Sequence, residues 1–394
     1  MKKFLLLLLF FSPLAQSQIL THSKELGLYQ TNKKTHFIQD SEMLSPKSAD
    51  FIGHKLIINA LEKGRTLVYS TDTWKKQVSI SHQFDNPEFV NIKDFPYKIS
   101  SQSFMGKPVE MTHNKEKMWI PYYRLSWDTN SRQASAIAQV DLHTMKIDKL
   151  IPSGSIPKMV KVSHDNKILA STHWGDNTVG LYNLKDDNII SYDFIIIDKK
   201  MDTSKIGGDR DINCGWCLRG TVFTEDNKYL LIGKMGGGGI AVVDVVNKKY
   251  IGTIRQVPPT PRHLVLSKGI LYISTVASGE VAKISMDIIS EEIEHLKNKN
   301  KSTLKMSDWK TVKLGSGVRT LALSKDEKYI YAAMNSSSEL GVIDNETMKI
   351  KEKYKVASFP VGLAVSDDDT YIAVTSQGKD GRGGGNHVDI FERK

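Results

Sequence analysis

The sequence predicts an all-β protein, a seven-bladed β-propeller of four-stranded antiparallel blades, because one pattern recurs along most of the chain. Each copy has a starting residue, an apolar strand, a polar turn and a second apolar strand. The copies follow one another at intervals of about 40 to 60 residues, a period typical of propeller blades. A unit of this size buries both of its faces only when it packs against neighbouring units around a common axis.

The clearest copy is the segment 360–375, PVGLAVSDDDTYIAVT, and the segment 318–333 matches it position by position. After its second apolar strand, a typical copy continues with a turn rich in Gly, Asn or Ser and a third strand that ends near Asp or Asn. A seventh, degenerate copy is expected over 56–71. The four remaining copies begin at Pro108, Pro157, Leu218 and Pro261.

Two intervals between copies are longer than the others, and an insertion explains each. The first insertion lies between Tyr192 and Asn213 and ends in the acidic stretch GGDRD. The second lies between Ser285 and Trp309 and carries isoleucines and a leucine at helical spacing. We therefore expect a long loop in the first insertion and a short surface helix in the second.

The two ends of the repeat array leave one blade incomplete. The last copy stops near Glu392 without a fourth strand, and the chain before residue 50 has no repeat of its own. An open blade would leave unpaired backbone groups at a sheet edge. We therefore expect residues 18–50 to close the ring, through a strand within 24–40 that forms the outermost strand of the last blade. Residues 51–394 then form the propeller.

Residues 1–17 have the pattern of a secretory signal peptide. Two lysines precede an apolar run from Phe4 to Phe11, and Ala15 and Ser17 are small residues of the kind that a signal peptidase reads. The run is shorter than the roughly 20 apolar residues of a membrane-spanning helix, and no later segment is apolar enough to span. We expect cleavage after Ser17 and a mature protein that is periplasmic or secreted, with no membrane span.

Basic residues outnumber acidic residues by 54 to 44, which gives a formal net charge of +10 at pH 7. A basic surface favours anionic partners, so we expect an anionic small molecule, an envelope polymer or a protein partner. The charges of both signs are interspersed, and the sequence has no arm or block rich in Lys and Arg. This distribution argues against a dedicated nucleic-acid-binding protein.

The two cysteines, Cys214 and Cys217, form the motif Cys-Gly-Trp-Cys. In an oxidising compartment two such close thiols are expected to form a disulfide, here one that braces a loop. Covalent haem is excluded because Leu218 stands where haem attachment needs His. Zinc would need two further ligands and no second cysteine pair exists, so we expect no metal site and no cofactor.

The repeats resemble those of the YVTN-type β-propellers, which belong with the lactonase-like proteins to one seven-bladed superfamily. The resemblance rests on the starting residue, apolar strand, Ser-Asp turn and Tyr-Ile strand, and it covers about residues 105–394 and more weakly 50–104. It implies the fold. The family and its relatives include surface-layer proteins, periplasmic nucleic-acid binders, lactonases and a lyase acting on cyclic antibiotics, so it implies no single activity.

The residue after each copy's start is expected to face the mouth of the central channel. Four of these six residues are cationic, and cations that converge on one mouth would form an anion site suited to carboxylate or phosphate. The alternative is that each cation pairs with an acidic residue of a neighbouring blade and only staples the ring. The six residues are Val109, Lys158, Arg219, Arg262, Arg319 and Val361.

Loops on the same face supply further candidates. Arg124, Trp127 and Trp174 are expected to contribute ligand contacts, because Arg and aromatic side chains are typical anchors of binding surfaces. His173, His263 and His387 are the candidate general bases if the protein is instead a lactonase or lyase. No pair of carboxylates at a diagnostic spacing accompanies them, so we favour a binding protein over an enzyme. A structural or adhesive scaffold is the third alternative.

Overall fold

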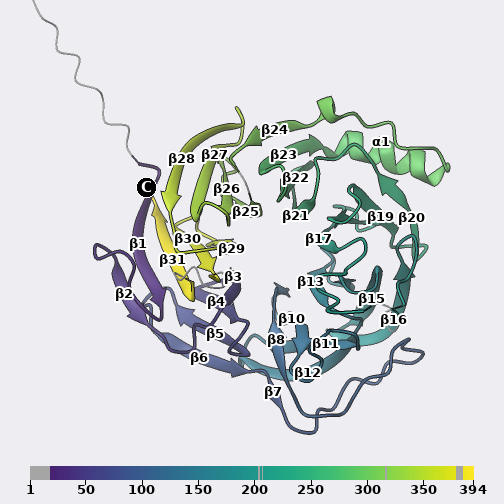
Figure 1. The fold of residues 1–394 in the computed structure, drawn as a ribbon, viewed down its shortest axis with the longest axis horizontal. Helices are drawn as coiled ribbons and strands as arrows, with labels where there is room; N and C mark the ends of the chain where they lie inside the picture. The colour runs from purple at the N-terminus through teal and green to yellow at the C-terminus, as the bar shows by residue number, and fades with distance from the viewer. Residues whose placement is uncertain (1–17, 203–204, 206, 316, 379–384) are drawn as a thin grey trace, which may run out of the picture.

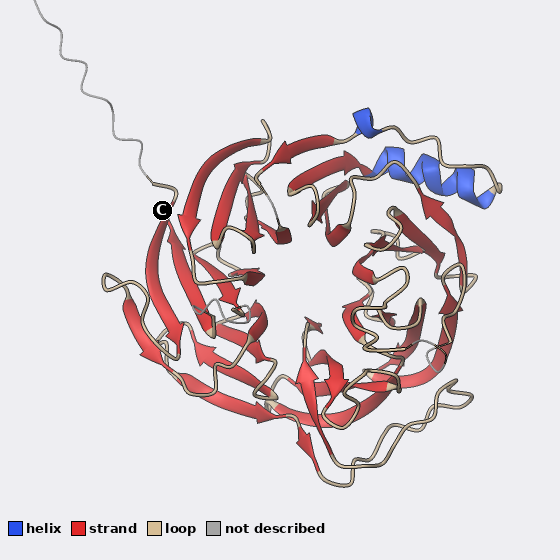
Figure 2. Ribbon diagram, viewed as in Figure 1, coloured by secondary structure: helices blue, strands red, loops and turns tan. Residues whose placement is uncertain are grey.

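Seven sheets follow one another around a common axis and form a closed ring (Figures 1 and 2). The computed structural model describes residues 18–202, 205, 207–315, 317–378 and 385–394. The fold predicted from the repeats, a seven-bladed propeller of four-stranded antiparallel blades, is confirmed. The expected signal peptide, residues 1–17, lies outside the described residues.

Five blades have four strands that run from the axis outward in sequence order. The first blade is β3 (Pro46–Ile52), β4 (Lys55–Ala60), β5 (Arg65–Ser70) and β6 (Lys76–Ser81). The third is β13 (Pro157–Val162), β14 (Ile168–His173), β15 (Thr178–Lys185) and β16 (Asn188–Ile196). The fourth is β17 (Leu218–Phe223), β18 (Tyr229–Lys234), β19 (Ile240–Asp244) and β20 (Lys249–Ile254). The fifth is β21 (Pro261–Ser267), β22 (Ile270–Thr275), β23 (Glu280–Ser285) and β24 (Lys310–Lys313). The sixth is β25 (Val318–Leu323), β26 (Tyr329–Met334), β27 (Glu339–Asp344) and β28 (Lys349–Lys355).

The second blade departs from this plan at its inner edge. Two short strands, β8 (Phe104–Pro108) and β9 (Thr112–His113), both pair with β10 (Lys117–Leu125), so the innermost position is interrupted. The chain between them includes Glu110 and Val109; the backbone N–H of Val109 donates to the carbonyl of Pro121 over 3.2 Å, and Val109 lines the cavity described below. The blade is completed by β11 (Ser135–Asp141), β12 (Lys146–Ser153) and the short β7 (Gln83–Phe84), which pairs with β8.

The last blade joins the two ends of the chain. Its strands β29 (Pro360–Val365), β30 (Tyr371–Ser376) and β31 (His387–Arg393) are followed by β1 (Leu20–Gly27). β1 pairs antiparallel with β31 along its whole length, and β2 (His36–Gln39) adds a fifth strand parallel to β1. The fourth strand, β1, therefore begins before the expected range 24–40, because its polar sequence, LTHSKELG, does not alternate as a half-buried strand usually does. The outermost strand, β2, lies within that range.

The second insertion contains the expected helix, α1 (Met286–Lys297), followed by the short 3₁₀ helix η1 (Met306–Asp308). Ser285 caps α1 by accepting a hydrogen bond from the backbone N–H of Asp287. The apolar side of α1, Ile289 and Ile293, packs on the core between the fourth and fifth blades. Nothing in the described part of the chain forms a helix long and apolar enough to cross a membrane.

Deleting residues 18–45 should lower the melting temperature and promote aggregation. The truncated chain would lack β1, expose the edge of β31 and remove the buried Leu20 and Leu26 from the core. Thermal melting and light scattering of the truncated protein are compared with those of a control protein that begins at residue 18. Identical melting of the two proteins would contradict a role for β1 in closing the ring.

Candidate functional site

The inner strands of six blades share a local irregularity at their start. In each, the ladder between the first and second strands shifts register directly after the first residue, so that the second residue has no partner in the ladder. A bulge of this kind redirects a side chain out of the sheet's regular alternation. The residues in this position are Lys47, Lys158, Arg219, Arg262, Arg319 and Val361.

The structure brings the four predicted cations together and adds a fifth, Lys47. All five line one cavity of about 270 Å³ on the axis of the ring, with Val109 of the second blade also in its wall. Sequence reasoning missed Lys47 because the seventh copy was expected over 56–71, which is occupied by β4 and β5. The signal was present, since Pro46-Lys47 repeats the start of the copies at Pro157 and Pro261.

The five cations repel one another inside a poorly solvated space. Burial lowers the pKa of Lys47 well below its usual range, and the charges of the other four cations lower it further. Burial and the neighbouring guanidinium groups lower the pKa of Arg262 in the same way, and they lower that of Arg319 to about 10. Such mutual repulsion is relieved by any anion that enters the cavity.

Two of the cations have acidic partners. Lys158 forms an ion pair with Asp211 of the first insertion, and Arg219 forms one with Glu110 of the second blade. Arg219 also donates to the backbone carbonyl of Lys158 over 2.6 Å. These two cations are therefore paired, although neither pair joins neighbouring blades: Asp211 belongs to the first insertion, and Glu110 belongs to the second blade while Arg219 belongs to the fourth.

The other three cations have no carboxylate within ion-pair distance among the described residues. Lys47 donates to the side-chain oxygen of Gln377 over 3.1 Å. Arg262 is 8% exposed, and its nearest polar contact is the sulfur of Met235 at 3.5 Å. The guanidinium of Arg319 lies 5.2 Å from the ring centre of Phe359, and its Nε is buried without a hydrogen-bond partner in the described chain. Their donors remain available to a ligand.

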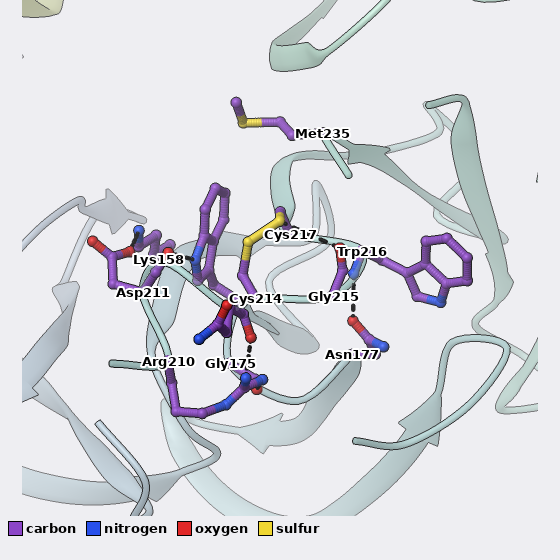
Figure 3. The surroundings of a disulfide bond; sticks show 12 residues. Lys158, Gly175, Asn177, Arg210, Asp211, Cys214, Gly215, Trp216, Cys217 and Met235 are labelled. Carbon is purple, nitrogen blue, oxygen red and sulfur yellow. Dashed lines mark hydrogen bonds and ion pairs between the residues drawn. A yellow bond between two sulfur atoms is a disulfide. The ribbon is translucent and has the colours of Figure 1, made fainter. Parts of the chain in front are cut away.

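Lys158 sits in a small aromatic enclosure beside Asp211 (Figure 3). Its Nζ lies 3.9 Å from the ring centre of Trp174 and 5.1 Å from that of Tyr123. The Tyr123 hydroxyl donates to the Asp211 carboxylate over 2.8 Å. Burial, together with the charges of Arg219 and Arg262, outweighs the attraction of Asp211 and lowers the pKa of Lys158 to about 7.

The first insertion is fastened to the ring by several contacts that fix Asp211. The Cys214–Cys217 disulfide closes its final turn, as predicted (Figure 3). Arg210 is fully buried and donates to the backbone carbonyls of Gly175 and Asn213. The glycine run that follows β18 fits against this turn, since a Cβ on Gly236 would lie 2.2 Å from a backbone oxygen of the insertion.

Of the three loop residues predicted to contact a ligand, two lie at or next to Lys158 and one lies in the core. Trp174 touches Lys158, as described, and Arg124 lies next to it, where it binds Asp209 over 2.7 Å and stacks on Tyr123. Trp127 instead packs on the core between the first and second blades. It does not line the cavity.

The three candidate bases do not meet one another. His173 is fully buried among polar groups of its own blade, 2.8 Å from the Thr178 hydroxyl, and burial lowers its pKa to about 3. His263 lines a second cavity of about 240 Å³ deeper along the inner strands, and its pKa is also lowered to about 3 by burial. His387 is buried in the last blade. None of the three lines the cationic cavity.

Comparison with known proteins assigns the family. Residues 112–382 match the family described as Lactonase, 7-bladed beta-propeller. The chain belongs to this family. As a member of the lactonase propellers it is also similar to Antigen Lp49 of Leptospira interrogans serogroup Icterohaemorrhagiae serovar copenhageni (strain Fiocruz L1-130), with 24% identity over 309 residues. That match covers 70% of this chain and 58% of the relative, so the chain spans less than two thirds of the relative's length.

Solved structures that resemble this lactonase-family chain are distant in sequence. The β-propeller domain of Cps50 (Swd1) from Myceliophteria thermophila aligns with a TM-score of 0.60 and 10% identity, over 89% of this chain and 97% of that one. Hydrazine synthase from Kuenenia stuttgartiensis aligns with a TM-score of 0.59 and 12% identity, over 93% of this chain and 99% of that one. At such identities the likeness concerns the fold alone.

Replacing Cys214 and Cys217 together by Ser should cost less than the roughly 3 kcal/mol expected for a 15-residue loop, because the ring they close is much smaller. The loss should instead loosen the insertion that holds Asp211. Denaturant unfolding measures the first effect, and hydrogen exchange of residues 207–217 measures the second, with the unreduced wild type as control. Two free thiols in the mass spectrum of non-reduced wild-type protein would contradict the assignment.

Proposed function

We propose that this protein is an exported binding propeller that holds a small anionic ligand in the cationic cavity. The observation that carries the proposal is the placement of five cations at one equivalent bulge position in five separate blades. A core that needed only packing at this position would use apolar residues, as Val361 in the last blade does. Repetition of a buried charge around a closed ring therefore supports a ligand as the common partner.

The charge balance of the cavity favours an anion. The five cations line the cavity with two carboxylates, Asp211 and Glu62, and Glu62 itself binds Lys107 over 2.7 Å. A third carboxylate, Glu110, lies outside the lining and pairs with Arg219. Burying unpaired charge is costly, and a carboxylate or phosphate would supply the missing partners. The planar guanidinium groups of Arg262 and Arg319 suit such oxygens, because each can bind two of them at once. A cavity of about 270 Å³ fits a small metabolite or the end of a polymer.

Export is supported by two features that are independent of the site. The N-terminal sequence has the charged start, apolar run and small residues of a secretory signal. The Cys214–Cys217 disulfide suits an oxidising compartment. A relative that is named an antigen of a bacterium agrees with a location in the envelope or outside the cell.

A second candidate, an enzyme that opens lactones, is favoured by the family to which the chain belongs. The chemistry needs a group that accepts a proton near neutral pH. Within the cavity that group would be Lys158, whose pKa is about 7, with Tyr123 and Asp211 beside it. In this candidate the arginines bind an acidic substituent of the substrate, so both functions use the same anion site.

Replacing Arg262 or Arg319 by Ala should weaken binding of the ligand by about 1.5–3 kcal/mol, roughly 10- to 150-fold, because each substitution removes a hydrogen bond to a charged group. Isothermal titration with a panel of small dicarboxylates and sugar phosphates gives the measurement. Arg255→Ala is the matched control, since Arg255 is exposed and outside the cavity.

Three outcomes of that titration separate the alternatives. Equal losses in the Arg255 control would mean that net charge alone attracts the anions and would contradict the site. An absence of binding across the panel would favour a scaffold function. Turnover of a lactone that carries a carboxylate, abolished by Lys158→Met while binding persists, would favour the enzyme.

Affinity for a dicarboxylate should be constant below pH 7 and fall as the pH rises above it. The pKa of Lys158 is about 7 in the free protein, and a bound anion favours the protonated amine and raises that pKa, so binding takes up a proton above pH 7. Titration in buffers of different ionisation enthalpy measures this uptake. The Lys158→Met protein should lose the part of the pH dependence that begins near pH 7, while Lys47, whose pKa is also lowered, keeps its own part. An unchanged dependence near pH 7 would contradict this assignment.

A further inference from the structure

Two histidines and two carboxylates meet at the seam where the chain ends pair. His22 and Glu25 belong to β1, and His387 and Asp389 belong to β31. Glu25, His387 and Asp389 are completely buried, and only 16% of the His22 side chain is exposed. The four groups therefore have little water to solvate them, although they carry the chemistry of metal ligands.

One ligand atom each of His22, Glu25 and Asp389 lie within 4.8 Å of one another, and His387 lies beside this group. His22 Nε2 lies 3.1 Å from Asp389 Oδ1 and 4.0 Å from Glu25 Oε1. His387 Nε2 lies 3.4 Å from Glu25 Oε2 and 3.6 Å from the same Asp389 oxygen. Zinc binds His nitrogen and carboxylate oxygen at about 2.0–2.2 Å, which places two tetrahedral ligands about 3.4 Å apart.

Three of the atoms joined by these distances have no hydrogen-bond partner in the described part of the chain. They are Nε2 of His22, Nε2 of His387 and Oδ1 of Asp389. Each nitrogen is close to a carboxylate oxygen, yet the angles do not allow a hydrogen bond. Buried polar atoms are rarely left in this state, and these three are all buried within the same cluster.

We propose that His22, Glu25, His387 and Asp389 form a binding site for a divalent transition-metal ion, of which Zn²⁺ fits best. Two imidazole nitrogens and two carboxylate oxygens are ligands that zinc accepts in four-coordinate sites. The two negative charges of the carboxylates balance the two positive charges of the ion. The site involves no residue of the cationic cavity and does not depend on the proposed ligand.

Neighbouring groups hold three of the four side chains in place. The Glu25 carboxylate accepts hydrogen bonds from the backbone N–H of Thr31 over 2.7 Å and of Asn32 over 2.8 Å. The outer oxygen of Asp389 accepts one from the backbone N–H of Ala357 over 3.0 Å, which leaves the inner oxygen for the ion. The ring of His22 stacks on Phe391 at 4.7 Å. Fixed outer contacts of this kind are usual around metal ligands.

An ion at this place would connect the first strand of the protein to the last. Two ligands come from each strand, so the site exists only when β1 is seated on β31. Binding free energy of such a site is folding free energy. The metal would therefore close the ring in addition to the backbone hydrogen bonds between the two strands.

The test measures the metal content of a protein that consists of residues 18–394. This protein is purified without an affinity tag that binds metal. Elemental analysis after dialysis should find about one zinc per chain. A strong chelator should lower the melting temperature by about 5 °C or more, and added Zn²⁺ should restore it. Substituted Co²⁺ should give the visible absorption of a four-coordinate N/O site.

Variants distinguish this site from adventitious surface binding. His387→Ala and the more conservative Asp389→Asn should both lose the bound metal, and Asp389→Asn should melt like the chelated wild type. His143→Ala is the matched control, because His143 and Glu116 form a pair of the same kind, 2.7 Å apart, that is exposed to solvent. The control should keep both its metal and its melting temperature.

Metal-free wild-type protein that does not bind added Zn²⁺ or Co²⁺ would overturn the proposal. So would bound metal that survives in the Asp389→Asn protein.

Discussion

The pairing of β1 with β31 is the interaction on which the ring depends. A propeller blade is stable only between two neighbours, so an unclosed array would leave two apolar faces and a strand edge in water. Here the closing strand comes from the opposite end of the chain, and residues such as Leu20 and Leu26 complete two different interblade cores. Because the inner strands are held in a closed circle, the bulged residues of five blades line the same cavity.

The closed ring brings the cations at one equivalent position of five blades together in one cavity. Arg262 or Arg319 on an isolated blade would lie in water with its usual pKa, whereas in the ring each is buried beside other cations. Buried cations that lie close together destabilise the fold unless anionic groups pair with them. Two receive carboxylates from the protein itself, and the proposal assigns the rest to the ligand. The same geometry explains why the site is invisible until the repeats are aligned.

Much of this arrangement could be predicted from the sequence, because repeat period and strand pattern are local signals. The blades, the disulfide and four of the five cations follow from them. Lys47 was missed because the first blade has Gly53-His54 where the copies at Pro157, Val318 and Pro360 have a turn that begins with Ser and contains Asp, which hid its inner strand. The histidines were harder to place from the sequence. Whether a histidine side chain faces the channel or the core depends on packing between strands, and His173, expected at the channel, is buried in its blade. The cluster at the seam joins residues from opposite ends of the chain, and no motif spacing reports such a contact.

The insertion that holds Asp211 affects which anions can bind in the cavity. Because the insertion holds this carboxylate next to Lys158, its effective concentration there is high. A free anion would have to compete with that effective concentration to bind Lys158. Simple monovalent anions such as chloride or acetate, offering one contact, are poorly placed to displace it. A molecule with two separated acidic groups can occupy Arg262 and Arg319 first and then exchange with Asp211. Under the proposed function, the acidic loop would compete with the ligand and would select its valence and shape in addition to its charge.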